Sequence, residues 1–317
     1  MIPCFPEFIP VSLDLHDELV PFFNGIQNGM CENTFATLFL DSFRYHYVVS
    51  RYNGQCYLTK GEIRGVHFLH IYGEFPSDDD FRALIAHPAL AECRCLTLIP
   101  EDVAKERAAF FDSLSLPVML GKDSSDYIYE RAALAELKGK AYHKKKNLVN
   151  QFLRDYEGRV EPVSEKNVGD AVSVLESWKA SRLVRGEDEG DFVQCSCALR
   201  HLQELGLSGI IVYADGQPAG FSLGERLGKR TMYDVHFEKG VDSVHGIYQA
   251  LNWYAARSLP EDITLINREQ DLGDAGLRQA KQSYRPCGMV NKYWIFLIPL
   301  EKAIMSWYNM EGLEKIY

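Results

Sequence analysis

The sequence contains a short apolar run, Ile263-Thr264-Leu265-Ile266, that leads directly into five polar residues, Asn267-Arg268-Glu269-Gln270-Asp271. An apolar run of this length is typical of a buried strand. Such strands usually end in turn residues such as Gly, Asn or Ser. Because α/β proteins gather polar side chains at the carboxyl ends of their strands to form reaction sites, this string is the first candidate for chemistry.

Part of this stretch occurs twice, as Thr97-Leu98-Ile99 and as Thr264-Leu265-Ile266, and both copies follow similar elements. Each is preceded by a hairpin turn, Asn53-Gly54 or Asp215-Gly216, because these dipeptides between apolar runs favour tight β-turns. In order along the chain there follow a strand-like run (66–71 and 231–237), a helical stretch (79–91 and 247–256), the tripeptide, a further helix and an extended segment (117–120 and 289–298). We interpret this order as an internal repeat, with two unrelated α/β domains as the alternative.

The repeat predicts an α/β protein with two copies of a mixed sheet flanked by helices. We expect residues 1–130 to form the first copy, 131–157 a linking basic helix, and 158–317 the second copy. The order of elements resembles the GNAT superfamily, in which a three-stranded meander precedes a helix, a strand, a helix and a last strand. The segment Leu277-Arg278-Gln279-Ala280, with Tyr284 and Gly288, resembles the fourth-helix motif of that fold.

The composition is that of a globular protein, with 46% apolar and 25% charged residues in 317 positions. A net charge of −10 argues against a surface that coats nucleic acid, although a local basic patch is compatible with it. Residues 1–7 have no signal-peptide pattern, and the most apolar late stretch, 293–300, is too short to span a bilayer. We therefore expect no transmembrane segment and a cytoplasmic location.

The eight cysteines contain no CxxC motif. Two CxC pairs, Cys93/Cys95 and Cys195/Cys197, lack a His/Cys partner pair at the usual zinc spacing. Metal binding at these pairs is one interpretation. Reduced, buried thiols are the preferred one, as in most cytosolic proteins.

A second charged stretch lies between the copies, where a strand at 126–130 precedes a predicted long helix that reaches Phe152. Within nine residues this stretch has five lysines, at positions 138, 140, 144, 145 and 146. Lysine occupies positions where the apolar stripe of the helix should continue, so the basic face extends onto the otherwise buried side. One interpretation is a solvated face whose lysine stems cover apolar surface. The other is a phosphate-binding surface, where Tyr142 and His143 would stack on a base or ribose.

The two strings together resemble the DUF2156 family, the C-terminal domain of phosphatidylglycerol lysyltransferases and its stand-alone relatives. The resemblance covers residues 32–298 and rests on these motifs: Lys138-Gly139-Lys140, Tyr142-His143, Lys145-Lys146-Asn147, Asn267 to Gly273, Gly276-Leu277-Arg278, Ala280-Lys281 and Ser283-Tyr284. It implies a tandem GNAT-like fold. It also implies a relation to membrane-bound enzymes that move an aminoacyl group from aminoacyl-tRNA to a lipid hydroxyl. Those enzymes carry a multi-span membrane region that this sequence lacks. The resemblance therefore does not decide between a lipid and a small molecule as the acceptor.

Acyl transfer from an ester needs a positioned acceptor, a proton acceptor and stabilisation of an oxyanion. The second copy offers residues for each role. We expect Glu269 and Asp271 to orient an amino group or accept a proton, Asn267 and Arg268 to donate to the carbonyl, and Tyr284 to act as a general acid. The expected substrate-binding residues are Arg278, Lys281, Lys138, Tyr142, Lys144, Lys145, Lys146 and His236, the last of which we expect to titrate near neutrality.

Each of these residues also has a purely structural interpretation. Asp271 or Asp274 caps the following helix, which is the preferred interpretation for Asp274. Arg268 and Glu269 form an interdomain salt bridge, and Arg278 pairs with Asp274 at i, i+4 spacing. Tyr284 belongs to the core, and His236 is a structural strand residue. The corresponding stretch of the first copy, Pro100-Glu101-Asp102, lacks the polar run, which favours a site in the second copy.

Three functions remain open at this stage: an aminoacyltransferase, an acetyl-CoA-dependent N-acyltransferase, and a catalytically silent protein that binds a phosphate ligand. GNAT enzymes hold the CoA pyrophosphate on a glycine-rich loop at the start of a helix. Here the loop at 238–246 has a different glycine spacing and contains Asp242, so acyl-CoA is possible but atypical. The expected partner is the acceptor end of aminoacyl-tRNA, and no metal is expected.

Overall fold

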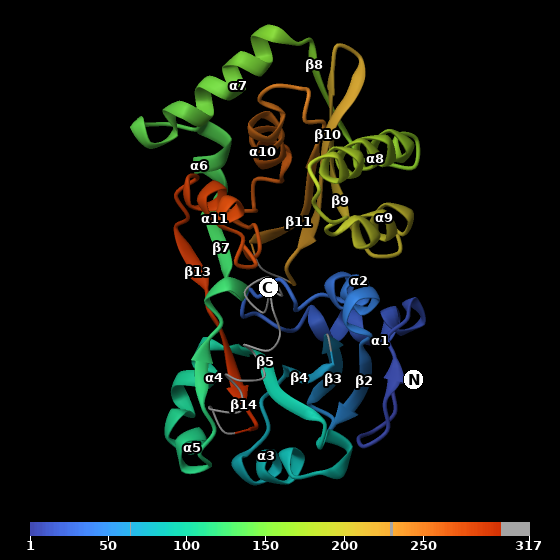
Figure 1. The fold of residues 1–317 in the computed structure, drawn as a ribbon, viewed down its shortest axis with the longest axis vertical. Helices are drawn as coiled ribbons and strands as arrows, with labels where there is room; N and C mark the ends of the chain where they lie inside the picture. Colours follow the sequence, from blue (N-terminus) through green and yellow to red (C-terminus); the bar gives the residue numbers. More distant parts are fainter. Residues whose placement is uncertain (64, 229–230, 299–317) are drawn as a thin grey trace. The chain divides into compact units, whose positions relative to one another are not determined.

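The computed structural model describes residues 1–63, 65–228 and 231–298 (Figure 1). Two compact units make up the chain. Unit 1 comprises Met1–Asp126, Gln270–Arg278 and the described part of Met289–Tyr317, and unit 2 comprises Tyr127–Glu269 and Gln279–Gly288. The string at 267–271 therefore divides between the units after Glu269. Each unit is built around one seven-stranded mixed sheet.

The two sheets have the same strand order. The first runs β1 (Ile9–Pro10), β2 (Val48–Tyr52), β3 (Cys56–Ile63), β4 (Val66–Gly73), β5 (Cys93–Pro100), β14 (Lys292–Phe296) and β6 (Val118–Leu120). The second runs β8 (Gly158–Pro162), β9 (Ser208–Ala214), β10 (Gln217–Arg226), β11 (Met232–Gly240), β12 (Leu265–Asn267), β7 (Asp126–Glu130) and β13 (Gly288–Val290). In both, a meander of antiparallel strands is followed by one parallel pair, β4–β5 or β11–β12. The predicted repeat is confirmed by this order.

One strand of each sheet comes from a distant part of the chain. Strand β14 lies between β5 and β6 of the first sheet, and β7 lies between β12 and β13 of the second. The prediction that residues 289–298 form one extended segment of the second copy is therefore wrong. The segment divides at Asn291 into β13 and β14, and Ile295 of β14 joins the apolar core of the first sheet.

In unit 1, strand alternation directs side chains to two helical layers. Leu69 and Ile71 of β4 face the core that contains Phe81 and Phe111, whereas Phe68 and Tyr72 contact Tyr45 and Phe23 on the other face. The helices are α1 (His16–Phe23), α2 (Phe35–Tyr45), α3 (Asp78–Ile85), α4 (Glu101–Glu106) and α5 (Ala108–Ser113), with 3₁₀ turns at Leu13–Leu15, Pro88–Leu90 and Lys122–Ser124. The helix predicted over 79–91 ends at Ile85, since Pro88 starts a separate 3₁₀ turn.

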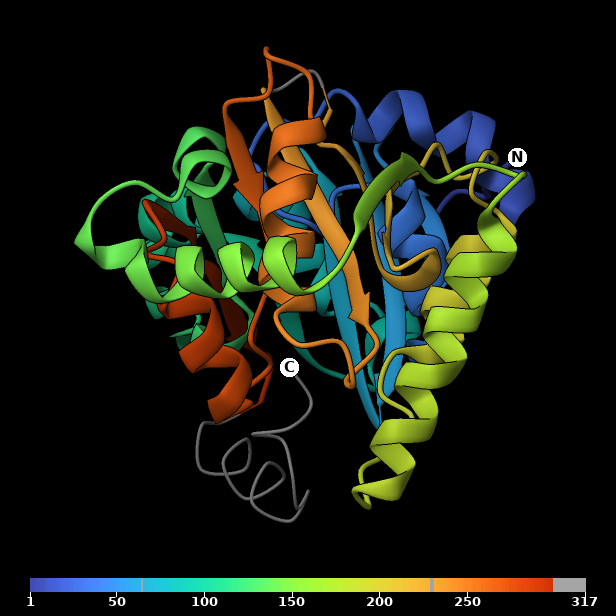
Figure 2. The same cartoon turned by 90° about the horizontal axis from the view of Figure 1, so that it is seen from above.

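In unit 2, α7 (His143–Asp155) and α10 (Ile247–Ser258) cover one face of the sheet (Figures 1 and 2). Helix α8 (Val168–Val184), with α9 (Phe192–Arg200) packed against it, covers the other face. A short α6 (Arg131–Glu136) and a 3₁₀ turn (Lys140–Tyr142) precede α7, and α11 (Ala275–Gln282) spans the limit between the units.

The single long helix predicted from Leu134 to Phe152 is wrong, because the chain breaks between α6 and α7. Leu137 has a φ of 47° and Gly139 a φ of 88°, both outside the helical region. A side chain on Gly139 would meet no atom within 4 Å, so this glycine provides a backbone conformation rather than a close approach. The predicted hairpin turns are confirmed, and Asp215 and Gly216 form a two-residue loop with positive φ at both positions.

No helix among the described residues is long and apolar enough to cross a membrane, and residues 299–300 of the apolar stretch noted above lie outside the described part. All eight cysteines are free thiols, and six of them are buried. Burial raises the pKa of Cys93 to about 11 and that of Cys56 to about 12, so both thiols keep their protons.

A fully buried lysine stands at the start of β14. The Nζ atom of Lys292 lies 2.6 Å from Oε1 of Glu32 and 2.5 Å from Oδ1 of Asp126, and all three side chains are at most 8% exposed. Burial lowers the pKa of Lys292. The neighbouring Asp126, Cys31 and Glu32 together raise it by more, so the net pKa lies well above its usual value. Burial raises the pKa of Glu32.

We predict that Lys292→Met lowers the free energy of unfolding by about 3–5 kcal/mol, because it leaves buried carboxylates without their counterion. Urea unfolding followed by circular dichroism measures this. Lys122→Met, at an exposed lysine of the same unit, serves as the control and should change stability by less than about 0.5 kcal/mol. Equal effects of the two substitutions would contradict the structural role of Lys292.

Candidate active site

The polar string begins with a local turn that Asn267 holds in place. Asn267 is fully buried at the end of β12, and its Oδ1 accepts a hydrogen bond from the N–H of Glu269 at 2.7 Å. This Asx turn keeps Glu269 at a φ of 55°, in the left-handed region. Non-glycine residues in that region cost free energy and are concentrated at functional sites. The left-handed backbone conformation of Glu269 is therefore imposed by the Asx turn and not by the intrinsic backbone preference of glutamate.

Arg268 is a buried cation in unit 2. Its Nη2 donates to Oε2 of Glu238 on β11 at 2.5 Å, and the guanidinium lies over the rings of Tyr129 and Tyr284, 5.6 and 5.0 Å from their centroids. Burial lowers its pKa, but Glu238 and the two tyrosines outweigh that and raise it. The proposed Arg268–Glu269 bridge is thus replaced by Arg268–Glu238. Among the described residues, Nη1 of Arg268 has no hydrogen-bond partner.

Two cations lie close to the ring of Tyr284. The Nζ atom of Lys145 lies 4.4 Å from the centroid of its ring, on which Arg268 also packs. Burial raises the pKa of Tyr284 to about 12, so the phenol holds its proton at neutral pH. Burial and the charge of Arg268 lower the pKa of Lys145. The hydroxyl of Tyr142 donates to the carbonyl of Tyr284 at 3.1 Å, which ties this part of the basic stretch to the segment that follows α11.

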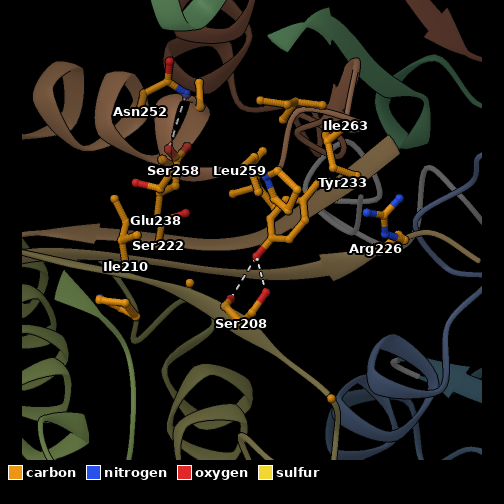
Figure 3. A pocket seen from close by; sticks show the side chains of 18 residues that line it. Ser208, Ile210, Ser222, Arg226, Tyr233, Glu238, Asn252, Ser258, Leu259 and Ile263 are labelled. Carbon is orange, nitrogen blue, oxygen red and sulfur yellow. Dashed lines mark hydrogen bonds between the residues drawn. The ribbon is translucent and has the colours of Figure 1, made fainter. Parts of the chain in front are cut away.

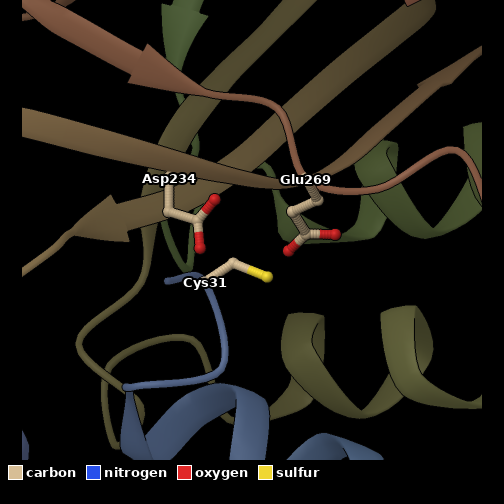
Figure 4. A group of neighbouring side chains, drawn as sticks. All are labelled: Cys31, Asp234 and Glu269. Atoms are coloured by element: carbon tan, nitrogen blue, oxygen red, sulfur yellow. The ribbon is translucent and has the colours of Figure 1, made fainter. Parts of the chain in front are cut away.

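His236 lies among three carboxylates. Its Nδ1 is 2.8 Å from Oε1 of Glu269 and 3.6 Å from Oδ2 of Asp234, and its Nε2 is 3.1 Å from Oε1 of Glu225. Figure 4 shows Asp234 on β11 and Glu269 on the segment that follows β12. The ring is 5% exposed. Burial lowers its pKa, but the carboxylates raise it well above 6.5, so His236 is an imidazolium at pH 7 and not the group titrating near neutrality that we expected.

The second half of the string has structural contacts in unit 1. Asp271 is 1% exposed and accepts two hydrogen bonds from Arg278, each 2.8 Å long, while Arg278 also donates to Asp123 at 2.6 Å. Asp274 accepts from the N–H of Leu277 and caps α11, as preferred from the sequence. The side chain of Arg278 binds Asp271 and Asp123 rather than Asp274.

The predicted residues therefore fall into two groups. Unit 2 contains Asn267, Arg268, Glu269, Tyr284, His236, Tyr142, Lys145 and Lys281, and unit 1 contains Asp271 and Arg278. Lys281 is 7% exposed, and its ammonium donates to the backbone carbonyl of Arg268 at 2.5 Å. This hydrogen bond fixes the backbone of the string at Arg268. The sequence did not single out Glu238 or Glu225, because isolated acidic residues on strands carry no motif.

The remaining lysines, Lys138, Lys144 and Lys146, are exposed. Lys138 and Lys146 line a groove of about 290 Å³ together with Trp253 and Arg257 of α10. The guanidinium of Arg257 lies 4.7 Å from the centroid of the Trp253 ring. Glu136 also lines the groove and pairs with Lys138 at 2.8 Å, so cations remain in excess beside the indole. Such a surface suits a nucleotide, since cations bind phosphate and aromatic rings stack on bases.

The loop that would hold a CoA pyrophosphate leads from β11 into α10. A Cβ atom on Gly246, at the start of α10, would lie 2.7 Å from the carbonyl oxygen of Leu148 in α7. A backbone oxygen thus covers the first turn of α10, and Asp242 places a carboxylate in the same loop. Asp242 is paired with the guanidinium of Arg185, and the backbone oxygen beside the start of α10 disfavours a phosphate there, so acyl-CoA stays an atypical prediction for this loop.

We predict that His236 makes stability depend on pH. Its folded-state pKa lies above the unfolded value of about 6.5, so its contribution is complete below that pH. The contribution is then lost as the pH rises through the folded pKa. Urea unfolding at pH 6 and pH 9 should show a larger loss of stability for the wild type than for His236→Gln. The exposed His143→Gln should behave as the wild type does, and an unchanged pH dependence in His236→Gln would contradict the charge assignment.

We predict that Arg278→Lys lowers the free energy of unfolding by about 1–3 kcal/mol, because lysine cannot replace a two-bond contact to a buried carboxylate. Thermal or urea unfolding tests this. Arg154→Lys, at an exposed arginine of α7, is the matched control. A stability loss no larger than that of the control would show that the Asp271–Arg278 contact is dispensable.

Comparisons with known proteins agree with this architecture. A crystal structure of a conserved protein of unknown function from Bacteroides thetaiotaomicron is 26% identical, with a TM-score of 0.83, and the match covers 94% of this chain and 100% of that one. The C-terminal domain (DUF2156) of a lysylphosphatidylglycerol synthetase candidate from Agrobacterium fabrum matches with a TM-score of 0.63 at 12% identity, over 93% and 96% of the two chains. L-PGS from Bacillus licheniformis matches with a TM-score of 0.61 at 13% identity, over 97% and 98%. No curated protein matches the sequence.

At these low identities the last two matches show the fold alone, and the predicted α/β architecture of two mixed sheets flanked by helices is confirmed. The family is shown by the sequence itself. The model of the family described as phosphatidylglycerol lysyltransferase, C-terminal, matches residues 23–296, which is most of the chain. The chain therefore belongs to the phosphatidylglycerol lysyltransferase C-terminal (DUF2156) family.

Proposed function

We propose that the protein is an aminoacyltransferase that takes its aminoacyl group from aminoacyl-tRNA and passes it to an acceptor with a hydroxyl or amino group. The observation that carries the proposal is the arrangement of Arg268 and Glu269 in unit 2. Nη1 of Arg268 is a buried N–H that has no partner among the described residues, and the carboxylate of Glu269 is held by His236 while its backbone N–H donates to Asn267. Family membership supports the same reaction class.

In the proposed reaction, the acceptor O–H or N–H attacks the carbonyl carbon of the aminoacyl ester. A new C–O or C–N bond forms, the C–O bond to the tRNA ribose breaks, and the acceptor's proton ends on the released ribose oxygen. Glu269 takes up that proton as the general base, and Nη1 of Arg268 donates to the oxyanion. Tyr284, which keeps its proton at neutral pH, is the candidate to protonate the ribose oxygen; the proton held by Glu269 then passes through solvent to the tyrosinate, so both groups return to their starting states.

The groove beside α7 is the proposed contact for the nucleotide end of the donor. Lys138, Lys146 and Arg257 would neutralise phosphates, and Trp253 would stack on a base. In a chain of net charge −10, this is a local positive surface suited to a short, charged segment rather than to long duplex. Lys144 lies exposed on the same helix and extends the positive field.

We predict that the wild type accelerates discharge of at least one labelled aminoacyl-tRNA from a mixed pool. Glu269→Gln should lower the rate by about 10²-fold or more, because the proton acceptor is lost. Glu165→Gln, at an exposed position of unit 2, is the control and should keep the wild-type rate. The proposal would be refuted if the protein neither bound nor discharged any aminoacyl-tRNA. An unchanged rate in Glu269→Gln would also refute it.

We predict that Trp253→Ala and Lys146→Ala weaken tRNA binding in different ways. Loss of stacking should weaken binding about tenfold at every salt concentration. Loss of Lys146 should also reduce the slope of log K against log salt by about one unit. Filter binding between 50 and 300 mM salt measures both, with Lys166→Ala as the exposed-lysine control. Wild-type affinity and slope in both variants would place the tRNA contact elsewhere.

A further inference from the structure

Unit 2 contains a cavity of about 430 Å³ between α10 and the sheet (Figure 3). The volume lies within the range of pockets that hold small organic ligands, about 300–1,000 Å³. Its walls are largely apolar and include Ile210, Val235, Ile263 and Ile266. Small side chains such as Ala255 and Ala256 of α10 leave this space open where a larger residue would fill it.

One end of the cavity carries the polar side chains Asn252 and Glu238. Asn252 is 4% exposed, and its Nδ2 lies 3.5 Å from Oε1 of Glu238. That contact sets the orientation of the amide, because the reverse orientation would place two oxygens together. It leaves Oδ1 of Asn252 buried without a hydrogen-bond partner among the described residues. A buried acceptor without a partner is costly and calls for a donor.

The hydroxyl groups of Tyr233, Ser208 and Ser258 in the wall already have partners. The Tyr233 hydroxyl donates to the carbonyl of Ser208 at 2.9 Å and lies 3.1 Å from its Oγ, as Figure 3 shows. Among the described side chains that line the cavity, the one buried polar atom without a partner is Oδ1 of Asn252. Recognition of a ligand's polar group is therefore focused at this end.

The charge at this end is already balanced. The carboxylate of Glu238 pairs with the guanidinium of Arg268, so the inner end is neutral overall. A second buried cation would have no counterion of its own, and burying an unpaired charge is far more costly than burying a neutral N–H or O–H. The geometry and the charge balance both favour a neutral donor.

We propose that this cavity binds a neutral, largely apolar small molecule whose single N–H or O–H group donates a hydrogen bond to Oδ1 of Asn252. The cavity shares Glu238 with the proposed transfer site through the Arg268–Glu238 pair, but the binding proposal does not depend on the transfer reaction. The apolar walls supply affinity through burial of the ligand's body, and Asn252 supplies selectivity for the donor.

The test uses the full-length protein and three probes with the same ring: benzyl alcohol, ethylbenzene and benzylammonium. Isothermal titration calorimetry and thermal shift measure binding of each. We expect benzyl alcohol to bind at least about tenfold more tightly than ethylbenzene, which leaves the acceptor unpaired. Benzylammonium should bind more weakly than benzyl alcohol. Equal binding of the alcohol and ethylbenzene, or tighter binding of the cation, overturns the proposal, as does binding of none.

Two variants locate the site. Asn252→Leu should remove the preference for benzyl alcohol over ethylbenzene, and Ala255→Leu should weaken binding of both at least tenfold by filling the cavity. Ala180→Leu places the same substitution at an exposed position of α8 and should leave binding unchanged. Wild-type binding by Ala255→Leu in a correctly folded sample overturns the assignment of the cavity. The comparison of the three probes on the wild type stands even if a variant fails to fold.

Discussion

The burial of Lys292 is the constraint on which the arrangement of the chain depends. A lysine ammonium taken fully out of water is tolerated only with carboxylates at hydrogen-bond distance, here those of Glu32 and Asp126. Lys292 starts β14 and Asp126 starts β7, the two strands that complete sheets built mainly from other parts of the chain. Lys292, Glu32 and Asp126 therefore form one ion cluster that contains the first residue of β14 and the first residue of β7. Gln270 donates to the same Glu32 oxygen, which ties the polar string to the cluster.

The polar string has two kinds of role because it passes from one unit to the other. Its first three residues belong to unit 2, where Asn267 shapes the turn, Arg268 is buried against Glu238, and Glu269 meets His236. Its last two belong to unit 1, where Asp271 receives both hydrogen bonds of the Arg278 fork. The first group contains Arg268, whose Nη1 has no partner among the described residues, and Glu269, whose carboxylate is partly exposed, so chemistry is expected there.

Much of the fold could be predicted from the sequence, because hairpin dipeptides and the repeated tripeptide mark elements through local physics. The assignment of β13 and β14 to different sheets could not be predicted, because no local pattern in residues 289–298 indicates which sheet each strand joins. Leu137 in a left-handed conformation broke the predicted helix, and no propensity rule marks a leucine for that position. The candidate site was located by a run of polar residues, but its partners Glu238, Glu225 and Trp253 became visible only when the strands and helices were in place.

The most direct test compares Glu269→Gln with Asp271→Asn in two measurements, the discharge rate of aminoacyl-tRNA per folded molecule and the free energy of unfolding. The account predicts that Glu269→Gln loses about 10²-fold or more in rate and remains folded. It predicts that Asp271→Asn loses stability while the folded fraction keeps its rate. The opposite pattern, a slow but stable Asp271→Asn and a fully active Glu269→Gln, would contradict the account.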